Sequence, residues 1–93
     1  MDRSLNKLPI ESLSMDLLRI ALGYHRGSEK MAERFSEEAL KRISEIKKES
    51  IKPYFLNVLF KIPTALSNKD KNRLSEDALM YSILCKNYAK KFC

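Results

Sequence analysis

Glycine is scarce in this chain, with only Gly23 and Gly27 among 93 residues. All-β folds use glycine for tight turns, and two glycines cannot supply many of them. The chain is instead rich in Leu, Lys, Glu and Ala, which favour helices. We therefore predict an all-α fold, a small bundle of about four helices. Its length predicts a single domain over residues 1–93.

Apolar residues recur every three or four positions in the first half of the chain, which is the spacing of one face of a helix. This pattern predicts a first helix over residues 11–22, ending before Gly23. A second helix is expected from about residue 29, with Ser28 as its N-cap, to about Ser50. Pro53 disfavours helical geometry at the residue before it, so we expect the second helix to end or kink there and a third to start at Pro53.

The third helix is expected to lie in the middle of the bundle or at a subunit contact, because residues 54–62 are apolar nearly all round. Residues 63–73 are predicted to form a loop with a polar tip. Ser75 then resembles an N-cap, and Leu74 and Leu79 have the spacing of a hydrophobic staple. These signals predict that a fourth helix starts at Ser75 and runs towards the C-terminus.

Cys85 and Cys93 are the only cysteines, and they lie eight positions apart near the end of the chain. This is a poor disulfide framework, and no Cys/His cluster has the spacing of zinc ligands. No apolar run reaches the roughly 18 residues of a membrane span, and no secretory signal is expected. We therefore expect a reducing, intracellular location, in the cytoplasm, with no membrane contact and no metal.

The enzyme hypothesis has little support in the sequence. His25 is the only histidine, and phosphate-binding glycine loops are missing. Arg19 and His25 have the Arg-x5-His spacing that some helical ribonucleases use, but Gly23 lies between them and is expected to end the helix. We predict a protein without catalytic residues or cofactor, and keep a metal-independent ribonuclease as a third hypothesis.

The first hypothesis is a non-catalytic protein–protein interaction module. The apolar segment between Pro53 and Pro63 offers more apolar surface than one face of a small bundle can cover. We predict that it contacts a protein partner or forms a homo-oligomer. The expected contact residues are Tyr54, Phe55, Val58, Leu59 and Phe60, with Tyr81 and Leu84 packing beside them.

The alternative is a small basic nucleic-acid-binding protein. The formal net charge is +6, and the basic surplus lies outside the charge-balanced second helix. Contacts to phosphates would give salt-sensitive binding without sequence preference, although a basic surface also serves solubility. The expected contact residues are Lys69, Lys71, Arg73, Lys86, Lys90 and Lys91.

The C-terminal half also resembles a known family. Residues 74–84 (LSEDALMYSIL) resemble the pattern L-x-x-E-x-x-L-[YF]-x-x-L in the last α-domain helix of archaeal GINS subunits, with Asp77 in place of the usual Glu. Residues 46–51 (IKKESI) resemble the R-x-x-K-[IL] stretch of the preceding helix, with Lys47 and Ser50 substituted.

The GINS resemblance covers residues 40–92 and implies the α-helical A domain alone, without the small β domain that these subunits usually add. It implies a DNA-replication scaffold that assembles through helix faces and bridges the MCM helicase and a RecJ-like partner. It implies no cofactor.

Overall fold

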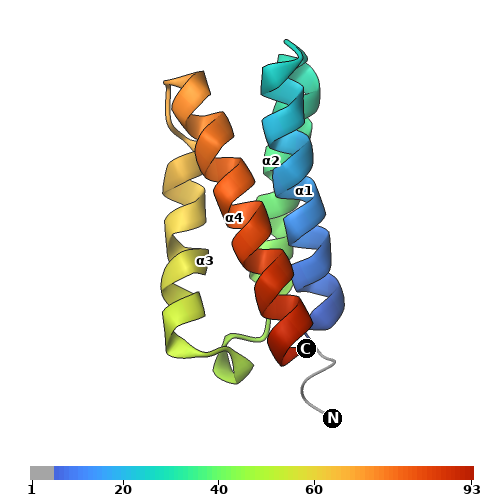
Figure 1. The fold of residues 1–93 in the computed structure, drawn as a ribbon, viewed down its shortest axis with the longest axis vertical. Coiled ribbons are helices and arrows are strands. Elements are labelled where there is room, and N and C mark those ends of the chain that lie inside the picture. The colour runs from blue at the N-terminus through green and yellow to red at the C-terminus, as the bar shows by residue number, and fades with distance from the viewer. Residues whose placement is uncertain (1–5) are drawn as a thin grey trace.

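The computed structural model describes residues 6–93, which form four antiparallel α-helices in up-down-up-down order (Figure 1). The predicted all-α bundle of four helices is confirmed. The helices are α1 (Lys7–His25), α2 (Glu29–Glu45), α3 (Pro53–Leu66) and α4 (Lys71–Phe92), and a short 3-10 turn, η2 (Lys48–Ser50), precedes α3. None of the described helices is long and apolar enough to cross a membrane.

The central helix is α1, which packs closely against α2 on one side and α4 on the other. Its core residues Ile10, Leu13, Leu17 and Ile20 are completely buried. The placement of residues 54–62 in the middle of the bundle is wrong, since α3 lies at the edge of the bundle and packs mainly on α4. The other placement, at a subunit contact, stays a prediction. A helix that is apolar all round can also be an edge helix if part of its apolar surface stays exposed.

Helix α1 extends beyond the predicted residues 11–22 at both ends. Gly23 does not end the helix, because it faces α2 at a close contact: a Cβ there would lie 3.1 Å from the Cβ and the backbone N of Ala32. Gly27 is the residue that turns the chain, and its φ of +79° is in the region that favours glycine.

The connection between α2 and α3 is longer than predicted, because α2 ends at Glu45 and not near Ser50. The Asn6 side chain fixes this connection. Its Nδ2 donates to the Lys47 carbonyl at 3.0 Å, and its Oδ1 accepts from the Lys47 N–H at 2.7 Å. Ile46 and Ile51, on either side of this anchor, are buried in the core. The predicted restart at Pro53 is confirmed, since Pro53 is the first residue of α3.

The predicted loop over residues 63–73 is mostly helical, and only residues 67–70 lie between α3 and α4. Helix α3 continues through Pro63 for one more turn, where the lost backbone N–H is near the helix end. Asp70 is the N-cap of α4, and its carboxylate accepts from the backbone N–H groups of Asn72 and Arg73 at 3.1 and 3.2 Å.

The N-cap predicted at Ser75 is therefore wrong. Ser75 lies inside α4, where its hydroxyl donates to the Ala21 carbonyl of α1 at 3.2 Å. The predicted staple is also wrong, because Leu74 is completely buried whereas Leu79 is exposed. Asp70 reaches the free N–H groups one turn earlier, which leaves Ser75 to join α4 to α1.

Candidate functional site

The predicted contact segment of α3 is divided between the core and the surface. Phe55 and Leu59 are only 1% exposed. The Phe55 ring stacks on Tyr88 of α4 with centroids 4.0 Å apart, so it contributes to packing inside one molecule. The prediction that these two residues contact a partner is wrong, because a partner cannot reach them on the folded chain. Val58 is half-buried and also packs against the core.

The exposed residues of the predicted segment do not form one patch. Tyr54 and Phe60 are 56% and 65% exposed, but six residues of a helix rotate them to positions about 120° apart. Tyr54 faces α4, where its ring lies 6.0 Å from Tyr88. On α4, Tyr81 is half-buried against the core and Leu84 is exposed.

A larger exposed apolar surface lies along α1 and α4. Its members are large apolar side chains that are between 37% and 73% exposed. We call it the outer face, and its residues are Leu8, Met15, Leu22, Leu79, Met80 and Ile83. Sequence reasoning missed the three residues from α1, although their spacing of seven, close to two helical turns, places them on one stripe and could have revealed them.

Small side chains bring the two helices of this face together. Beside the large buried residues Leu74 and Tyr88, α4 has a series of small residues, of which all but Ser75 are buried: Ser75, Ala78, Ser82, Cys85 and Ala89. Two of these serines hydrogen-bond across the contact.

The central link between α1 and α4 is reciprocal. The Ser14 hydroxyl donates to the Ser82 carbonyl at 2.8 Å, and the Ser82 hydroxyl donates to the Ser14 carbonyl at 2.9 Å. Small residues at a helix contact permit a close approach of the two axes. This pair therefore fixes the register, and it places Met15 and Ile83, each one residue further along its helix, near the middle of the outer face.

A groove of about 770 Å³ runs between α1 and α4 on the same side of the bundle. Met15 and Leu18 contribute apolar walls, while Lys86 and Lys90 contribute positive charge. Ser14 and Ser82 lie at its floor, so the hydrogen-bonded contact between the helices closes it. The groove is open to solvent and combines an apolar centre with a basic end.

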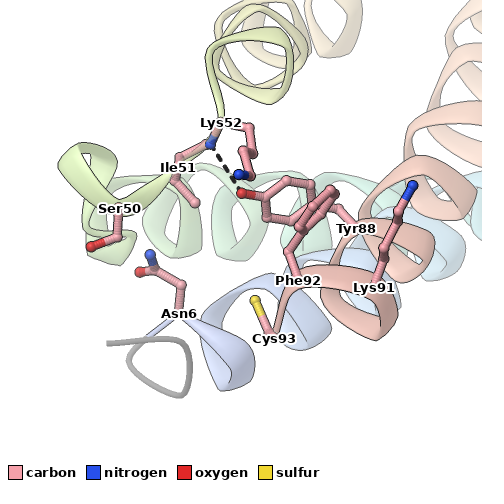
Figure 2. Close-up of a pocket in the computed structure, with 8 residues that line it drawn as sticks. All are labelled: Asn6, Ser50, Ile51, Lys52, Tyr88, Lys91, Phe92 and Cys93. Carbon is pink, nitrogen blue, oxygen red and sulfur yellow. Dashed lines mark hydrogen bonds between the residues drawn. The ribbon is translucent and has the colours of Figure 1, made fainter. Parts of the chain in front are cut away.

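A second hollow of about 280 Å³ lies at the end of the bundle near the C-terminus (Figure 2). Here the Tyr88 hydroxyl accepts from the Lys52 backbone N–H at 3.0 Å, which ties the start of α3 to α4. The amines of Lys52 and Lys91 lie 5.2 and 5.4 Å from the centroid of the Phe92 ring. These cation–π contacts stabilise the bundle end without converging on a common ligand position.

The predicted nucleic-acid residues fall into two separate groups. Lys69, Lys71 and Arg73 lie around the start of α4, and Lys71 contacts the Tyr24 ring at 5.2 Å. Lys86, Lys90 and Lys91 lie in its last two turns. At 1.5 Å per residue, about 28 Å of helix separates Lys71 from Lys90. The exposed apolar residues of α4 lie between the two groups, so they do not form one continuous basic surface.

The helix break expected between Arg19 and His25 is wrong, because α1 continues through Gly23 to His25 and carries both residues. Arg19 contacts the carboxylate of Asp16 at 3.6 Å, and its guanidinium lies 5.3 Å from the centroid of the Phe35 ring. His25 is exposed in the last turn of α1, about 120° around the helix from Arg19. Within residues 6–93, no three His, Cys, Asp or Glu side chains are grouped to hold a metal ion.

Asp16 is the one buried carboxylate among the described residues, and it lies between α1 and α2. Desolvation raises its pKa above the usual value, although Arg42 and Arg19 act in the opposite direction. The nearest Arg42 nitrogen, Nε, is 4.0 Å from Asp16 Oδ2, and neither atom has a hydrogen-bond partner in the described structure. The pair joins α1 to α2 with loose geometry.

Comparisons with protein-family models, with curated proteins and with solved structures found no match to this chain.

Proposed function

We propose that this protein is a non-catalytic helical module that acts by binding protein through its outer face. The observation that carries the proposal is the exposure of large apolar side chains on adjacent helices. Met15, Leu79, Met80 and Ile83 are each between 44% and 51% exposed. Full burial of such a side chain is worth about 1.5–3 kcal/mol. A partner that covers this face would therefore gain a favourable apolar contact that the isolated chain lacks.

The arrangement of α4 strengthens this argument. Its hydrogen-bonded contact with α1 is made by the small Ser75 and Ser82, while Leu79, Met80, Ile83 and Leu84 are exposed. Scattered exposed leucines are normal on protein surfaces, but contiguous apolar patches mark interaction sites. Here the apolar residues follow one another along two neighbouring helices, with a groove between them.

The non-catalytic part of the proposal is supported by the surroundings of the candidate catalytic groups. Arg19 is engaged by Asp16 and Phe35, and His25 is exposed in the last turn of α1. Burial raises the pKa of the Cys85 thiol to about 12, so this cysteine stays protonated and is a poor nucleophile at neutral pH. We further propose a cytoplasmic location, because no disulfide joins Cys85 and Cys93.

The resemblance of residues 40–92 to the GINS α-helical domain suggests where such a module would act. We include in the proposal a scaffold role in a replicative helicase assembly. The resembling segment 74–84 contains Leu79, Met80 and Ile83, which supports the idea that the same residues carry the contact.

Site-specific photo-crosslinking in the cells that naturally make the protein tests the proposal. A photo-reactive amino acid replaces Met80 on the outer face or, as a matched control, the exposed Asn57 on α3. We expect adducts to protein from position 80 and not from position 57. Equal adduct formation at both positions, or none at position 80, would refute the interaction surface. Adducts only to proteins outside DNA replication would remove the GINS-like role and keep the module.

A second candidate function is sequence-independent nucleic-acid binding at the basic end of the groove. Lys7, Lys86 and Lys90 all line that groove, which supports this alternative. A mobility-shift titration with duplex DNA distinguishes it from the first. Binding that falls steeply with salt, and that is lost when Lys86 and Lys90 are changed to Glu, would favour it. Absence of binding at low salt would eliminate it.

A further inference from the structure

The pattern of side chains on the outer face is self-complementary. On α4, Glu76, Ile83 and Lys90 are spaced by seven residues and all are exposed. Seven residues are nearly two helical turns, so these three side chains form one stripe along α4. Ile83 is at the centre, with an acidic residue two turns before it and a basic residue two turns after it.

Helix α1 carries a matching stripe. Leu8, Met15 and Leu22 are also spaced by seven and exposed, with Met15 at the centre. The Ser14–Ser82 hydrogen bonds bring the two stripe centres to within about 3 Å of one level, since each centre is one residue of 1.5 Å rise beyond this pair, in opposite directions. A single two-fold axis, nearly perpendicular to the helices, can therefore pass through the middle of both stripes.

We propose that the outer face binds a second copy of this chain across such a two-fold axis. This inference rests on the proposed function and names its partner. In the dimer, α4 packs antiparallel on α4 of the other copy, with Ile83 against Ile83. Glu76 of each copy then lies opposite Lys90 of the other, and Leu8 lies opposite Leu22. Both halves of the contact repeat by symmetry, as in an isologous interface.

The charges on the stripe are available for this pairing. The side chains of Glu76 and Lys90 make no hydrogen bond or ion pair within the described residues. An acidic foreign helix would suit Lys90 but would meet Glu76 with like charge. A second antiparallel copy satisfies both ends at once, which is why we favour self-association over a foreign partner.

The size of the face is adequate for a stable dimer. The bundle measures 41 × 20 × 19 Å, so one long side is about 41 by 20 Å. A standard stable interface takes about 800 Å² from each partner, which is the scale of such a side. On α4 the exposed centre of the stripe is apolar and its two ends are charged, which matches the usual order of apolar core and polar rim.

Light scattering after size exclusion, and sedimentation equilibrium, test the dimer with the full chain. The chain mass is 10.8 kDa, and we expect twice that mass at micromolar concentration. Ile83→Glu places two like charges at the two-fold axis and should give a monomer. Phe60→Glu, an equally drastic change of an exposed residue on α3, should leave the dimer intact. Circular dichroism checks that each variant retains its helices.

A charge exchange tests the antiparallel register. Glu76→Lys and Lys90→Glu should each raise the dimer dissociation constant about 3- to 30-fold, because each change affects two symmetric pairs. The double variant should restore it to within about 3-fold of the original value. If the losses of dimer affinity in the two single variants simply add in the double variant, the proposed register is wrong.

A crosslinking variant keeps the proposal testable if Ile83→Glu does not fold. In a chain with Cys93→Ser, Ile83→Cys should be joined to its symmetry mate by a short bis-maleimide, whereas Phe60→Cys should not. A strict monomer at every concentration, or a dimer that Ile83→Glu leaves unchanged, overturns the inference. If that monomer still gives position-80 adducts to another protein, the interaction module survives without self-association. If it gives none, both proposals fail.

Discussion

Replacement of Phe55 by Ala should destabilise the fold strongly, whereas the same change at Phe60 should have almost no effect. The two phenylalanines lie five residues apart in one apolar segment, but Phe55 is 1% exposed and Phe60 is 65% exposed. Truncation of a buried Phe costs about 3–5 kcal/mol, since it removes apolar burial and leaves a cavity. Phe55 also loses its stacking on Tyr88, at a centroid distance of 4.0 Å, worth roughly 0.5–1.5 kcal/mol.

Urea unfolding followed by circular dichroism measures both losses. A domain of this size has a total stability of about 5–15 kcal/mol, so the Phe55→Ala variant should be close to unfolding at room temperature. Phe60→Ala should stay within about 0.5 kcal/mol of the original chain, as is usual for surface changes. If Phe55→Ala fails to fold, Phe55→Leu should give a measurable loss of roughly 1–3 kcal/mol. Equal losses at the two positions would refute the placement of α3.

Four further predictions concern the fold. Gly23→Ala should lose about 1 kcal/mol in urea unfolding, because overpacking against the α2 backbone outweighs the gain in helix propensity, and an Ala32→Gly background should relieve part of the loss. Gly27→Ala has space but must adopt a positive φ, so it should lose about 1 kcal/mol without such relief. Because burial raises the Asp16 pKa, the folded state keeps the Asp16 carboxyl protonated to a higher pH than the unfolded state does. The stability of the original chain relative to Asp16→Asn should therefore fall as the pH rises from 4 to 7. If this relative stability rises instead, pairing of Asp16 with arginine dominates. In a chain with Cys93→Ser, Cys85 should resist maleimide labelling until urea unfolds the chain. Rapid labelling of Cys85 in the native protein would contradict its burial.

Local sequence patterns predict the helices of this protein but not where they end. Pro53 sets the start of α3 because its fixed φ and missing N–H act on the backbone directly. The end of α2 depends instead on Asn6, which bonds to Lys47 from 41 residues away. Gly23 stays helical because it fits against Ala32. Such contacts join residues that are remote in sequence, so a local pattern carries no information about them.

The same limit applies to the candidate site. Composition shows that the segment after Pro53 is rich in apolar residues, but it cannot show that Phe55 is buried while Phe60 is exposed. The stripe through Leu8, Met15 and Leu22 is visible in the sequence as a spacing of seven. The spacing alone does not show whether this stripe is buried or exposed. The fold shows that the opposite side of α1 fills the core and that this side stays exposed.

The contact between α1 and α4 explains why large apolar residues lie outside. The reciprocal Ser14–Ser82 hydrogen bonds, at 2.8 and 2.9 Å, require the two backbones to approach closely. Large side chains at the inward positions of α4 would prevent this approach, so the core of the contact is built from small residues. Polar residues at the outward positions would then stabilise the isolated bundle equally well. Leu79 and Ile83 occupy these outward positions instead, and the packing of one chain does not explain why they are apolar. A surface that a second molecule covers does explain it.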